Sequence, residues 1–594
     1  MGPLKGAIFV ILSSILLLLP LPTVEGQLWP QPQVLSLTGG QTIFLSEKFT
    51  ISAPDQPEIR SAADRYTRLI KKERWLPMST VLGAPSTAWK STRVTVLEKL
   101  DITVINCNAD LQHGVDESYE LVIGSGSSPA KALLSAQTVW GAMRGLETFS
   151  QLVHRENGRT VNGKARLIID TGVVIEDYPL YPHRGVLLDV SRNFYPVKDI
   201  KRTIRALSYN KLNVLHLHIT DSQSFPLELE LEPALSREGA YGRDFVYTKK
   251  MIRELIAYAR NYGVRVVPEI DTPGHALSWG GAYPEIITCM NKFWASGYAS
   301  EPGSGQLNPL LQKTYDVVKN VITEVATLFP DSFYHAGGDE INPKCWLDDP
   351  AVSGYISSSK AASNDSALGD LLTKFITETR TYIDAQKKIA VYWEDVLLDA
   401  KVNVSASALP KETTILQTWN NGPINTKKIT AAGYRAIVTS YDFYYLDCGH
   451  GGWVGKDPRY DQNFNDDATN TFNYGGGGGS WCAPFKTWAR IYDYDITANL
   501  TSQEARLVLG GEVALWSEQA DGTVLDARLW PRSSAMAESL WSGNRDPANS
   551  TEKRYADAIV RLNDWRYRMV GRGIDAEPLQ PMWCVKQPEM CNLS

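Results

Sequence analysis

Apolar runs alternate with helical patterns over most of the chain. From residue 184 onward, eight short runs rich in β-branched and apolar residues are separated by segments with helical periodicity. The runs are VLLDVS, VLHLHITD, VRVVPEID, FYHAGGDE, IAVYWED, TILQTWN, AIVTSYDFYYLD and GGEVALWSE. In one separating segment, apolar residues fall at i, i+3, i+4 and i+7 on a single stripe: Ile252, Leu255, Ile256 and Ala259. Eight strands that are each followed by a helix predict a (β/α)8 TIM barrel, which we place at residues 179–545.

A doubly wound sheet is the competing fold, but no GxGxxG turn follows the first predicted strand. In a barrel of this kind, polar residues at the carboxyl ends of the strands face the active-site mouth. Each of the eight runs carries acidic or aromatic residues towards that end. We therefore expect the chemistry of this protein at the carboxyl ends of the runs.

Residues from about 27 to 178 have a different character. Short strand-like runs (QTIFLS, ESYELVI and ARLIID) bracket two helical patterns, PEIRSAADRYTRLIKKE and AKALLSAQTVWGAMRGLETFSQLV. This arrangement predicts a compact α/β domain before the barrel. No HExxH motif occurs in it, so no metalloprotease site is indicated. Residues 546–594 are expected to form a helical tail closed by a disulfide.

The first 26 residues contain one Lys, a long apolar run and then small residues. This pattern is typical of a secretory signal peptide, which we place at residues 1–26. Pro20 and Pro22 interrupt the apolar run too early for a comfortable membrane span, which disfavours a signal anchor. We therefore expect a secreted, extracellular protein that does not use a membrane as a partner.

Secretion changes the interpretation of the seven cysteines. Cys448 and Cys482 flank a Gly-rich loop, Cys584 and Cys591 close a small ring, and Cys289 and Cys345 each follow a predicted strand-end motif. These pairings would make three disulfides and leave Cys107 free, although the sequence does not fix the connectivity. N-x-S/T sequons, consistent with glycosylation on the secretory route, occur at Asn364, Asn403, Asn499, Asn549 and Asn592.

Charge and composition narrow the choice of partner. The net charge is −6 and no long Lys/Arg run occurs, which argues against nucleic acid. The 17 tryptophans offer flat faces on which sugars stack, although most of them are expected to serve packing. His216 and His218 alternate on one face of a predicted strand, but no clear carboxylate partner accompanies them. We interpret them as core histidines and expect neither a metal nor another cofactor.

The stretch HAGGDE places Asp339 and Glu340 side by side behind Gly337 and Gly338. Consecutive Cα atoms lie about 3.8 Å apart, so two adjacent carboxyls do not flank a sugar ring from opposite sides, as the acids of an ordinary glycosidase do. They are better placed to serve two neighbouring atoms on one side of a substrate. A 2-acetamido sugar offers such atoms, because its glycosidic oxygen needs a proton and its acetamide N–H needs an acceptor. If the acetamide carbonyl is the nucleophile, no second catalytic carboxylate is needed.

Eight motifs follow one another over roughly residues 140 to 545: GAMRGLETFSQL, HRGVLLDVSRNFYP, HLHITDSQSFP, PEIDTPGH, HAGGDE, YWED, YLD and LWSE. In this set and its order, the chain resembles the β-N-acetylhexosaminidases of glycoside hydrolase family 20, the secreted fungal members above all. The resemblance implies that the domain before the barrel is a smaller, zincin-like α/β domain. As a set these motifs are specific, whereas each alone is weak.

The resemblance implies substrate-assisted catalysis with retention of configuration, through an oxazolinium intermediate. Glu340 would be the general acid and then the base that activates water. Asp339 would hold the acetamide N–H, and Tyr445 would donate its hydroxyl to the acetamide oxygen. The remaining implied roles are walls of the sugar pocket for Trp393, Trp419 and Trp516, hydroxyl binding for Arg184, Asp447 and Glu518, and support of the acid for Asp221 and His275.

Two positions do not fit the expected pattern: Arg184 departs from the barrel-mouth rule, and Ser222 departs from the family motif. Arg184 opens the first predicted barrel strand and so lies on its amino-terminal side, away from the expected mouth. Its role rests on the motif alone. Ser222 stands where the family often has a second acid after Asp221, which puts the polarity beside that residue in doubt.

The resemblance to fungal members also implies a propeptide at residues 27–95 that stays bound to the catalytic part without a covalent link. It would be processed near a basic stretch such as Lys71–Arg74 or at Arg93. Residues 96–178 would then form the N-terminal α/β domain. A homodimer is expected on the same grounds.

The sequence thus predicts an exo-acting enzyme that hydrolyses terminal, non-reducing β-linked GlcNAc or GalNAc, with chitobiose and other chitin oligomers as substrates. An inactive barrel that only binds carbohydrate is one alternative, and the presence of Asp339, Glu340 and Tyr445 disfavours it. An endo-acting chitinase is the other, but the DxxDxDxE strand of that family is absent.

Overall fold

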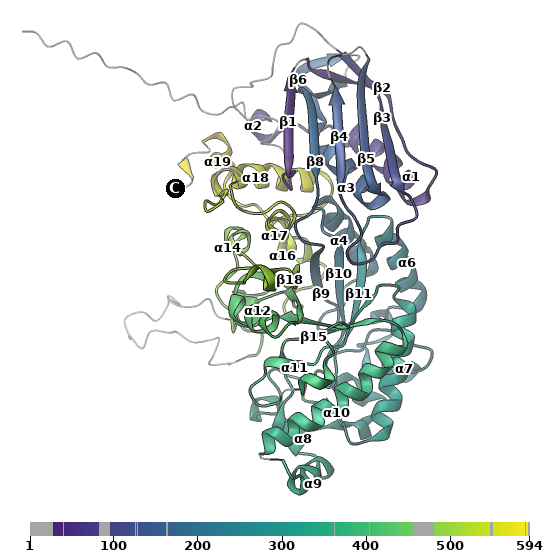
Figure 1. Ribbon diagram of the computed structural model, residues 1–594, viewed down its shortest axis with the longest axis vertical. Helices are drawn as coiled ribbons and strands as arrows, with labels where there is room; N and C mark the ends of the chain where they lie inside the picture. Colours follow the sequence, from purple (N-terminus) through teal and green to yellow (C-terminus); the bar gives the residue numbers. More distant parts are fainter. Residues whose placement is uncertain are drawn as a thin grey trace, which may run out of the picture.

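The computed structural model describes most of the chain between Leu28 and Cys591. The described residues are 28–39, 41–81, 95–124, 126, 129–161, 164–361, 363–402, 404–455, 480–546, 550–587 and 590–591. The predicted signal peptide lies outside them. A sheet domain occupies one end of the molecule, and the barrel with its helices forms the rest (Figure 1).

Eight parallel strands form the predicted closed barrel. They are β9 (His183–Asp189), β10 (Val214–Thr220), β11 (Arg265–Ile270), β14 (Phe333–His335), β15 (Ile389–Trp393), β16 (Thr414–Thr418), β17 (Arg435–Val438) and β18 (Val508–Leu515). Each overlaps one of the eight apolar runs, and β18 pairs with β9 to close the barrel. The TIM barrel expected from the pattern is therefore confirmed.

The helices that surround the barrel follow its strands in the chain. They are α4 (Val197–Tyr209), α5 (Pro233–Gly239), α6 (Lys249–Arg260), α7 (Gln312–Leu328), α8 (Pro343–Leu347), α9 (Pro350–Ser358), α10 (Asn364–Ala385), α11 (Asp395–Leu398), α12 (Gly422–Ala431), α13 (Tyr441–Tyr444), α14 (Trp488–Asp493), α15 (Ser502–Ala505), α16 (Leu525–Leu529) and α17 (Arg532–Trp541). The last two helices, α18 (Tyr555–Gly571) and α19 (Met582–Lys586), lie beside the sheet domain (Figure 1). On α6, the predicted stripe is the buried face, with Ile252, Leu255 and Ala259 in the core. Two short strands, β12 (Ile287–Thr288) and β13 (Gln306–Leu307), pair beside the barrel.

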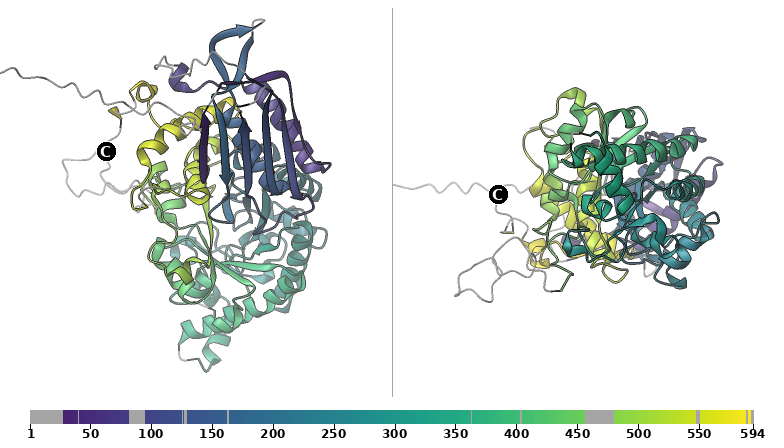
Figure 2. Two further views of the ribbon diagram at one scale, coloured as in Figure 1. Left: turned by 45° about the horizontal axis from the view of Figure 1, so that its top comes forward. Right: turned by 90° about the horizontal axis from the view of Figure 1, so that it is seen from below.

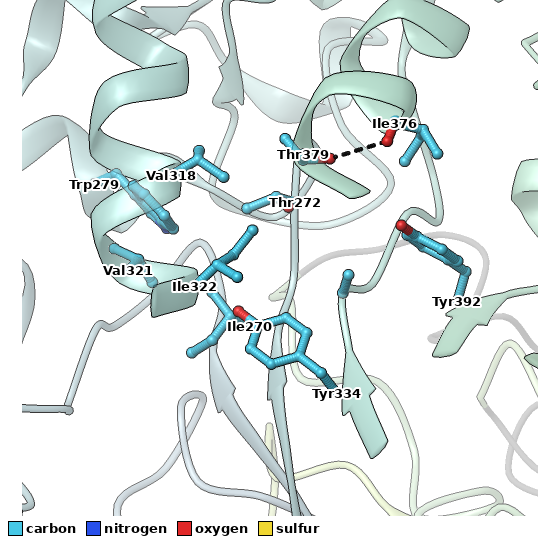
Figure 3. Close-up of a pocket in the computed structure, with 11 residues that line it drawn as sticks. Ile270, Thr272, Trp279, Val318, Val321, Ile322, Tyr334, Ile376, Thr379 and Tyr392 are labelled. Carbon is cyan, nitrogen blue, oxygen red and sulfur yellow. Dashed lines mark hydrogen bonds between the residues drawn. The ribbon is translucent and has the colours of Figure 1, made fainter. Parts of the chain in front are cut away.

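The core between the barrel and its outer helices holds a small apolar pocket (Figure 3). Ile270, Tyr334 and Tyr392 line it from the strand side, and Val318 and Val321 of α7 line it from the helix side. None of the acids singled out in the sequence lines this pocket. It is a space in the packing and not the site of the chemistry.

The N-terminal domain is an eight-stranded sheet in the order β1-β8-β4-β5-β3-β2-β7-β6. Its strands are β1 (Val34–Gly39), β2 (Ile43–Ser52), β3 (Thr95–Asn106), β4 (Tyr119–Gly124), β5 (Ala130–Thr138), β6 (His154–Val161), β7 (Lys164–Ile169) and β8 (Gly172–Asp177), and its helices are α1 (Pro57–Glu73), α2 (Met78–Val81) and α3 (Val139–Leu152). Helices α1 and α3 pack together on one face of the sheet, and the left view of Figure 2 shows the strands side by side. The coarse expectation of an α/β domain is confirmed, and its zincin-like character stays a prediction.

One predicted helix is wrong in its first half. The stretch from Ala130 to Thr138 forms strand β5, and the helix begins only at Val139. The reason is a period of two, in which Ala130, Ala132, Leu134 and Ala136 are buried and alternate with more exposed residues. Thr138 then caps the helix, because its side chain accepts from the backbone N–H of Trp140 and Gly141.

The segment expected to be a propeptide, as part of the N-terminal region, contributes β1, β2 and α1 to this domain. Strand β2 lies between β3 and β7, so a boundary at residue 95 runs through the middle of the sheet. The basic stretch Lys71–Arg74 ends α1, where Glu73 is buried against Arg568 of α18 and against Arg572, which follows the end of that helix. The other expected cleavage point, Arg93, lies outside the described residues. Cleavage of the chain stays a prediction.

Three disulfides join the predicted cysteine pairs: Cys289–Cys345, Cys448–Cys482 and Cys584–Cys591. Cys107 is free. Two of the sequon asparagines, Asn364 and Asn499, are exposed, whereas Asn403, Asn549 and Asn592 lie outside the described residues. In the part of the chain that is described, no helix has the length and apolarity to cross a bilayer.

Candidate active site

The two adjacent acids stand on a turn that follows β14. Gly337 and Gly338 have φ of 68° and 94°, and a Cβ added to Gly337 would lie 1.6 Å from Asp271 Oδ1. Only glycine fits at this position. The N–H of Gly338 donates to Asp271 Oδ1 over 3.1 Å, which ties the turn to the loop after β11.

Glu340 itself has φ of 51°, in the left-handed region that a non-glycine residue rarely adopts. Such a conformation costs on the order of 1–3 kcal/mol and persists where the surroundings hold it. Here the backbone N–H of Glu340 donates to Asp395 Oδ1 at 3.3 Å. The side chain of Asp339 is 14% exposed and that of Glu340 is 28% exposed. Asp339 Oδ1 is buried and has no hydrogen-bond partner among the described residues.

His275 lies against both acids, as the sequence analysis expected. Its Nε2 is 3.3 Å from Glu340 Oε2 and 3.7 Å from Asp339 Oδ2. Its Nδ1 is 3.0 Å from Asp221 Oδ1, and Asp221 is fully buried. Like Glu340, His275 adopts a φ of 51°. Asp221 therefore positions the His275 imidazole, and the imidazole in turn positions the Glu340 carboxylate.

The ionisation of this cluster follows from its crowded charges. Burial and the neighbouring charge of Asp271 raise the pKa of Asp339 well above its ordinary value. Burial also acts to raise the pKa of Glu340, but the hydrogen bond and charge of His275 outweigh it and lower that pKa. Burial opposes the charged form of His275, yet Asp221 and Asp339 raise its pKa well above the usual value. The two pKa shifts therefore give the pair one proton and favour its position on His275, beside an ionised Glu340.

An aromatic pocket lies beside the acids. Trp393, Tyr445 and Trp516 pack in one cluster, with ring centroids 6.1 Å apart for Trp393 and Trp516 and 6.0 Å apart for Tyr445 and Trp516. Trp419 packs against the same cluster, and its Nε1 donates to Asp395 Oδ2 over 2.5 Å. Asp395 also accepts from the backbone N–H of Glu340. It therefore links Trp419 in the pocket wall to the turn that carries Asp339 and Glu340.

The polar end of the pocket is built around Arg192. Its Nη2 lies 2.9 Å from Asp221 Oδ2 and 2.7 Å from Glu301 Oε1, and its guanidinium lies over the Trp516 ring at 5.1 Å. Burial raises the pKa of Asp447 to about 7. Burial, together with the charge of Glu301, raises the pKa of Glu518 well above its ordinary value. Asp447 Oδ1 is buried and, within the described residues, has no hydrogen-bond partner.

The placement of Arg184 corrects the sequence analysis. This residue is fully buried at the amino-terminal end of β9, where its Nη2 lies 2.8 Å from Glu117 Oε2 in the sheet domain. Its other guanidinium contacts are the carbonyl oxygens of Tyr181 and Lys211. Arg184 therefore fastens the sheet domain to the closed end of the barrel and does not reach the mouth. Arg192, eight residues further on, follows the carboxyl end of the same strand.

Sequence reasoning missed other residues of this site. Arg192 follows the first apolar run, so the rule that carboxyl ends face the mouth could have found it. Asp395 lies in the quoted YWED motif but carried no assigned role. Trp481 stands half exposed beside the pocket, with its ring centroid 6.0 Å from those of both Trp419 and Tyr445. Nothing in its Gly-rich surroundings indicated this position.

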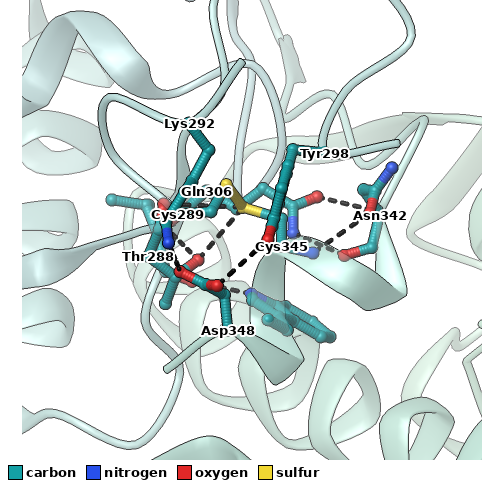
Figure 4. Close-up of a disulfide and its surroundings, with 10 residues drawn as sticks. Thr288, Cys289, Lys292, Tyr298, Gln306, Asn342, Cys345 and Asp348 are labelled. Atoms are coloured by element: carbon teal, nitrogen blue, oxygen red, sulfur yellow. Dashed lines mark hydrogen bonds and ion pairs between the residues drawn. A yellow bond between two sulfur atoms is a disulfide. The ribbon is translucent and has the colours of Figure 1, made fainter. Parts of the chain in front are cut away.

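The disulfide Cys289–Cys345 fastens the loop next to the acids (Figure 4). This loop carries Glu301, which binds Arg192, and Gln306, whose side chain accepts from the N–H of Asn342 at 2.6 Å. Ser300 in the same loop forms a hydrogen bond with Glu340. The cross-link therefore holds one rim of the site to the turn that bears the acids.

Three groups of side chains among the described residues have the composition of a metal site, but the one formed by Asp447, Cys448 and Cys482 has both its cysteines in a disulfide. Ligand atoms of His216, Glu269 and His335 lie within 4.8 Å of one another, and so do those of Asp221, Asp271 and His275. His216 and His218 do have carboxylate partners, Glu269 and Glu512, which corrects the interpretation that none was near. Acids and imidazoles in these groups already face each other as ion pairs, and the absence of a metal stays a prediction.

Comparison with known proteins places this geometry in a family. Residues 181–544 match the family model "Glycosyl hydrolase family 20, catalytic domain", and residues 28–152 match "beta-acetyl hexosaminidase like". A probable beta-hexosaminidase from Arthroderma benhamiae is 40% identical and covers 93% of this chain and 90% of its own length. Beta-hexosaminidase 1 from Coccidioides posadasii is 39% identical over 100% of this chain and 98% of its own. The chitobiase structure from Flavobacterium johnsoniae aligns with a TM-score of 0.69 at 25% identity, over 92% of this chain and 73% of that one. The chain belongs to glycoside hydrolase family 20.

Proposed function

We propose that the protein is an exo-acting β-N-acetylhexosaminidase in which the 2-acetamido group of the substrate is the nucleophile. The single observation that carries this mechanism is the placement of Asp339 and Glu340 on one turn, with Asp339 Oδ1 buried and unpaired among the described residues. That oxygen is an acceptor in need of a donor, which the acetamide N–H of the substrate supplies. Family membership supports the same reaction.

In the first step, the Glu340–His275 pair gives its proton to the glycosidic oxygen as the bond from that oxygen to C1 breaks. The acetamide carbonyl oxygen forms the new bond to C1 and produces an oxazolinium ion. Asp339 accepts the acetamide N–H. The positive charge that develops on the oxazolinium ring lowers the pKa of Asp339 and favours its carboxylate form, which in turn stabilises that charge. Tyr445 donates its hydroxyl to the carbonyl oxygen and orients it for attack.

In the second step, water takes the place of the leaving group. Glu340, now without its proton, takes a proton from this water as the water oxygen bonds to C1. The bond between C1 and the carbonyl oxygen breaks, and the acetamide group is restored. Two inversions at C1 give net retention of configuration. Asp221 and His275 support both steps, because they hold Glu340 in place and adjust its proton affinity.

Binding of the terminal sugar is assigned to the polar end of the pocket. Arg192, and not Arg184, is the arginine placed to bind hydroxyls at C3 and C4, since it lies over Trp516 at the mouth. Asp447 and Glu518 are placed to bind hydroxyls at C4 and C6. A sugar whose C4 hydroxyl carries a further unit would lose these contacts, which supports exo action on terminal residues.

The substrate class we propose is terminal, non-reducing β-linked GlcNAc or GalNAc, with chitobiose and longer chitin oligomers as natural examples. Relatives from Bombyx mori and Ostrinia furnacalis, each 34% identical, are named chitooligosaccharidolytic beta-N-acetylglucosaminidases, which supports this choice. The half-exposed ring of Trp481 at the rim offers a stacking face for the sugar that follows the cleaved bond.

Secretion, a bound propeptide and a homodimer complete the proposal. The three disulfides support an oxidising, secretory route. Amino-terminal sequencing of the protein from the culture medium tests both the removal of residues 1–26 and a cut near residue 95. Sedimentation analysis tests the dimer.

The deciding experiment compares nitrophenyl β-N-acetylglucosaminide with the same compound lacking the acetyl group. The wild-type enzyme should cleave only the acetylated compound at an appreciable rate. Glu340→Gln should lower turnover by roughly 10²–10⁴-fold, the usual contribution of a positioned acid. Asp339→Asn should also impair turnover, because attack by the acetamide loses its support. Equal cleavage of both compounds would refute the assignment of the nucleophile, and release of internal fragments from chitin oligomers would refute exo action.

A further inference from the structure

Acidic and imidazole side chains alternate along a line that runs from the mouth into the barrel. We refer to the set Glu340, His275, Asp221, His218, Glu269, His216, Glu512 and His183 as the acid–imidazole line. From the mouth inward, the first distances are 3.3 Å for Glu340 to His275, 3.0 Å for His275 to Asp221 and 2.8 Å for Asp221 to His218. They continue as 2.8 Å for His218 to Glu269, 3.0 Å for Glu269 to His216, 3.0 Å for His216 to Glu512 and 2.6 Å for Glu512 to His183.

The inner part of this line occupies space that the fold ordinarily fills with apolar residues. His216 and His218 come from β10, Glu269 from β11 and Glu512 from β18, and all point into the barrel core with side chains at most 2% exposed. Branched apolar side chains usually pack there. Buried charges weaken a fold unless they are paired, and apolar replacements are often as stable. A role beyond stability therefore has to be considered for this line.

The line carries balanced charges. Burial opposes the charged form of His216, but Glu512 and Glu269 outweigh it and raise the pKa of His216 to about 9. For His218, Glu269 and Asp221 likewise outweigh burial and raise the pKa well above its usual value. Each of these two imidazolium ions thus stands between two carboxylates, with one ring nitrogen facing each.

Glu269 is the branch point of the line. Its Oε1 accepts from Trp393 Nε1 at 2.7 Å, and Trp393 is a wall of the sugar pocket. Its Oε2 faces His218 at 2.8 Å and His216 at 3.0 Å. One carboxylate is therefore in contact with the pocket on one side and with the chain of groups leading to Glu340 on the other.

We propose that Glu269 is a positioning residue that couples the sugar pocket to the proton-donating pair. Through one oxygen it fixes the Trp393 indole, and through the other it holds His218, which holds Asp221 against His275 and Glu340. This inference rests on the proposed function and extends it, because Glu269 itself touches no substrate. It assigns to one buried carboxylate an influence on both substrate binding and proton donation.

The sign of its electrostatic effect follows from its position. The negative charge of Glu269 favours protons on the groups along the line, including the shared proton of His275 and Glu340. Removing that charge makes the pair lose its proton at lower pH. Activity on the alkaline side, which requires this proton, should then decline at lower pH than in the wild type.

Other titratable or charged groups also face these residues and remain unchanged in the test. Around Glu269 they are His216 and His218 of β10 and His335 of β14. Around His275 and Glu340 they are Arg192 after β9, Asp221 after β10, Asp271 after β11, Asp339 after β14 and Asp395 after β15.

The test compares Glu269→Gln with Trp393→Phe in the full-length protein. Trp393→Phe removes the indole N–H that donates to Glu269, whereas Glu269→Gln removes the negative charge and keeps an amide oxygen that accepts from the indole. KM for nitrophenyl β-N-acetylglucosaminide should therefore rise several-fold in Trp393→Phe and change less in Glu269→Gln. The alkaline limb of kcat against pH should move only in Glu269→Gln, by on the order of one pH unit towards lower pH, as expected for one buried charge at an effective dielectric constant near 20.

If Glu269→Gln does not fold, Glu512→Gln provides the same test further along the line. Its alkaline limb should move in the same direction by a smaller amount, with KM unchanged. The proposal would be overturned if the alkaline limb of kcat against pH stays in place in a folded Glu269→Gln or Glu512→Gln protein. It would also be overturned if the limb moves equally in Trp393→Phe. A wild-type protein that cleaves no acetylated substrate would instead refute the proposed function, and this inference with it.

Discussion

His275 Nε2 lies 3.3 Å from Glu340 Oε2, while the other ring nitrogen of His275 lies 3.0 Å from Asp221 Oδ1. The imidazole is thus held between a buried carboxylate and the acid that serves the substrate. Because Asp221 is the largest influence that raises the pKa of His275, the proton shared by His275 and Glu340 depends on the Asp221 charge.

Asp221→Asn should shift the alkaline limb of the profile of kcat against pH to lower pH. Loss of a close opposite charge lowers the pKa of a histidine by roughly 1–3 units, so the alkaline limb of kcat should move to lower pH and turnover at neutral pH should fall. Ser278→Ala is the matched control, since Ser278 Oγ donates to the Asp221 carbonyl oxygen over 2.6 Å and carries no charge. A limb that stays in place in Asp221→Asn, or moves equally in Ser278→Ala, would contradict this role.

The two arginines near opposite ends of β9 should respond differently to substitution. Arg192→Met removes the guanidinium at the mouth, and kcat/KM should fall by about 10–150-fold, the equivalent of one hydrogen bond to a charged group. Arg184→Met leaves Glu117 with only part of its compensation in a buried interface, and unfolding free energy should fall by roughly 3–5 kcal/mol. The folded Arg184→Met protein should keep wild-type kcat and KM. Kinetics and denaturant unfolding of both variants check this, and a large KM change in Arg184→Met would show that the assignment at the mouth is wrong.

Arg184 and Arg192 show which features of the site can be predicted from the sequence and which cannot. Eight apolar runs predicted the barrel, and the turn HAGGDE predicted where the acids stand, because both are local patterns. Arg184 and Arg192 lie in one motif, HRGVLLDVSRNFYP, and the motif alone does not say which arginine faces the substrate. The strand direction does, since β9 runs from Arg184 at the closed end towards Arg192 at the mouth.

Other parts of the structure could not be read from local patterns. Strand β5 was hidden because its alternating positions are mostly alanine and leucine, which also suit a helix. The carboxylate partners of His216 come from β11 and β18, which are far apart in sequence and meet only when the barrel closes. Pairings of this kind depend on the complete fold.

Removing the Cys289–Cys345 disulfide should affect both stability and catalysis. For a sequence separation of 56 between the cysteines, the chain-entropy model gives a loss of about 4 kcal/mol in unfolding free energy. Turnover of the folded Cys289→Ser/Cys345→Ser protein should also fall, because the loop it fastens carries Ser300 and Glu301. The control is Cys584→Ser/Cys591→Ser, which opens a ring at the tail and should leave kcat and KM unchanged. Equal kinetics in the two double variants would argue against a role for the loop in the site.

The junction between α1 and α18 should make stability depend on pH. Burial would raise the pKa of Glu73, but the guanidinium groups of Arg568 and Arg572 outweigh it and lower that pKa from 4.5 to about 2. Since the folded-state pKa lies below the unfolded value, this carboxylate stabilises the fold in full above pH 4.5 and loses the contribution as pH falls towards 2. The shift corresponds to about 3 kcal/mol.

Glu73→Gln should therefore unfold more easily than the wild type at neutral pH, and the difference should shrink steadily as the solution is acidified below pH 4.5. Denaturant unfolding at a series of pH values measures it. Glu98→Gln, at an exposed position of β3, is the control and should change stability little at any of them. Because Glu73 lies in the segment expected to be a propeptide, the wild-type measurement also reports how strongly that segment is held. A difference between Glu73→Gln and wild type that does not vary with pH would mean that the two arginines do not hold Glu73 ionised in the folded state.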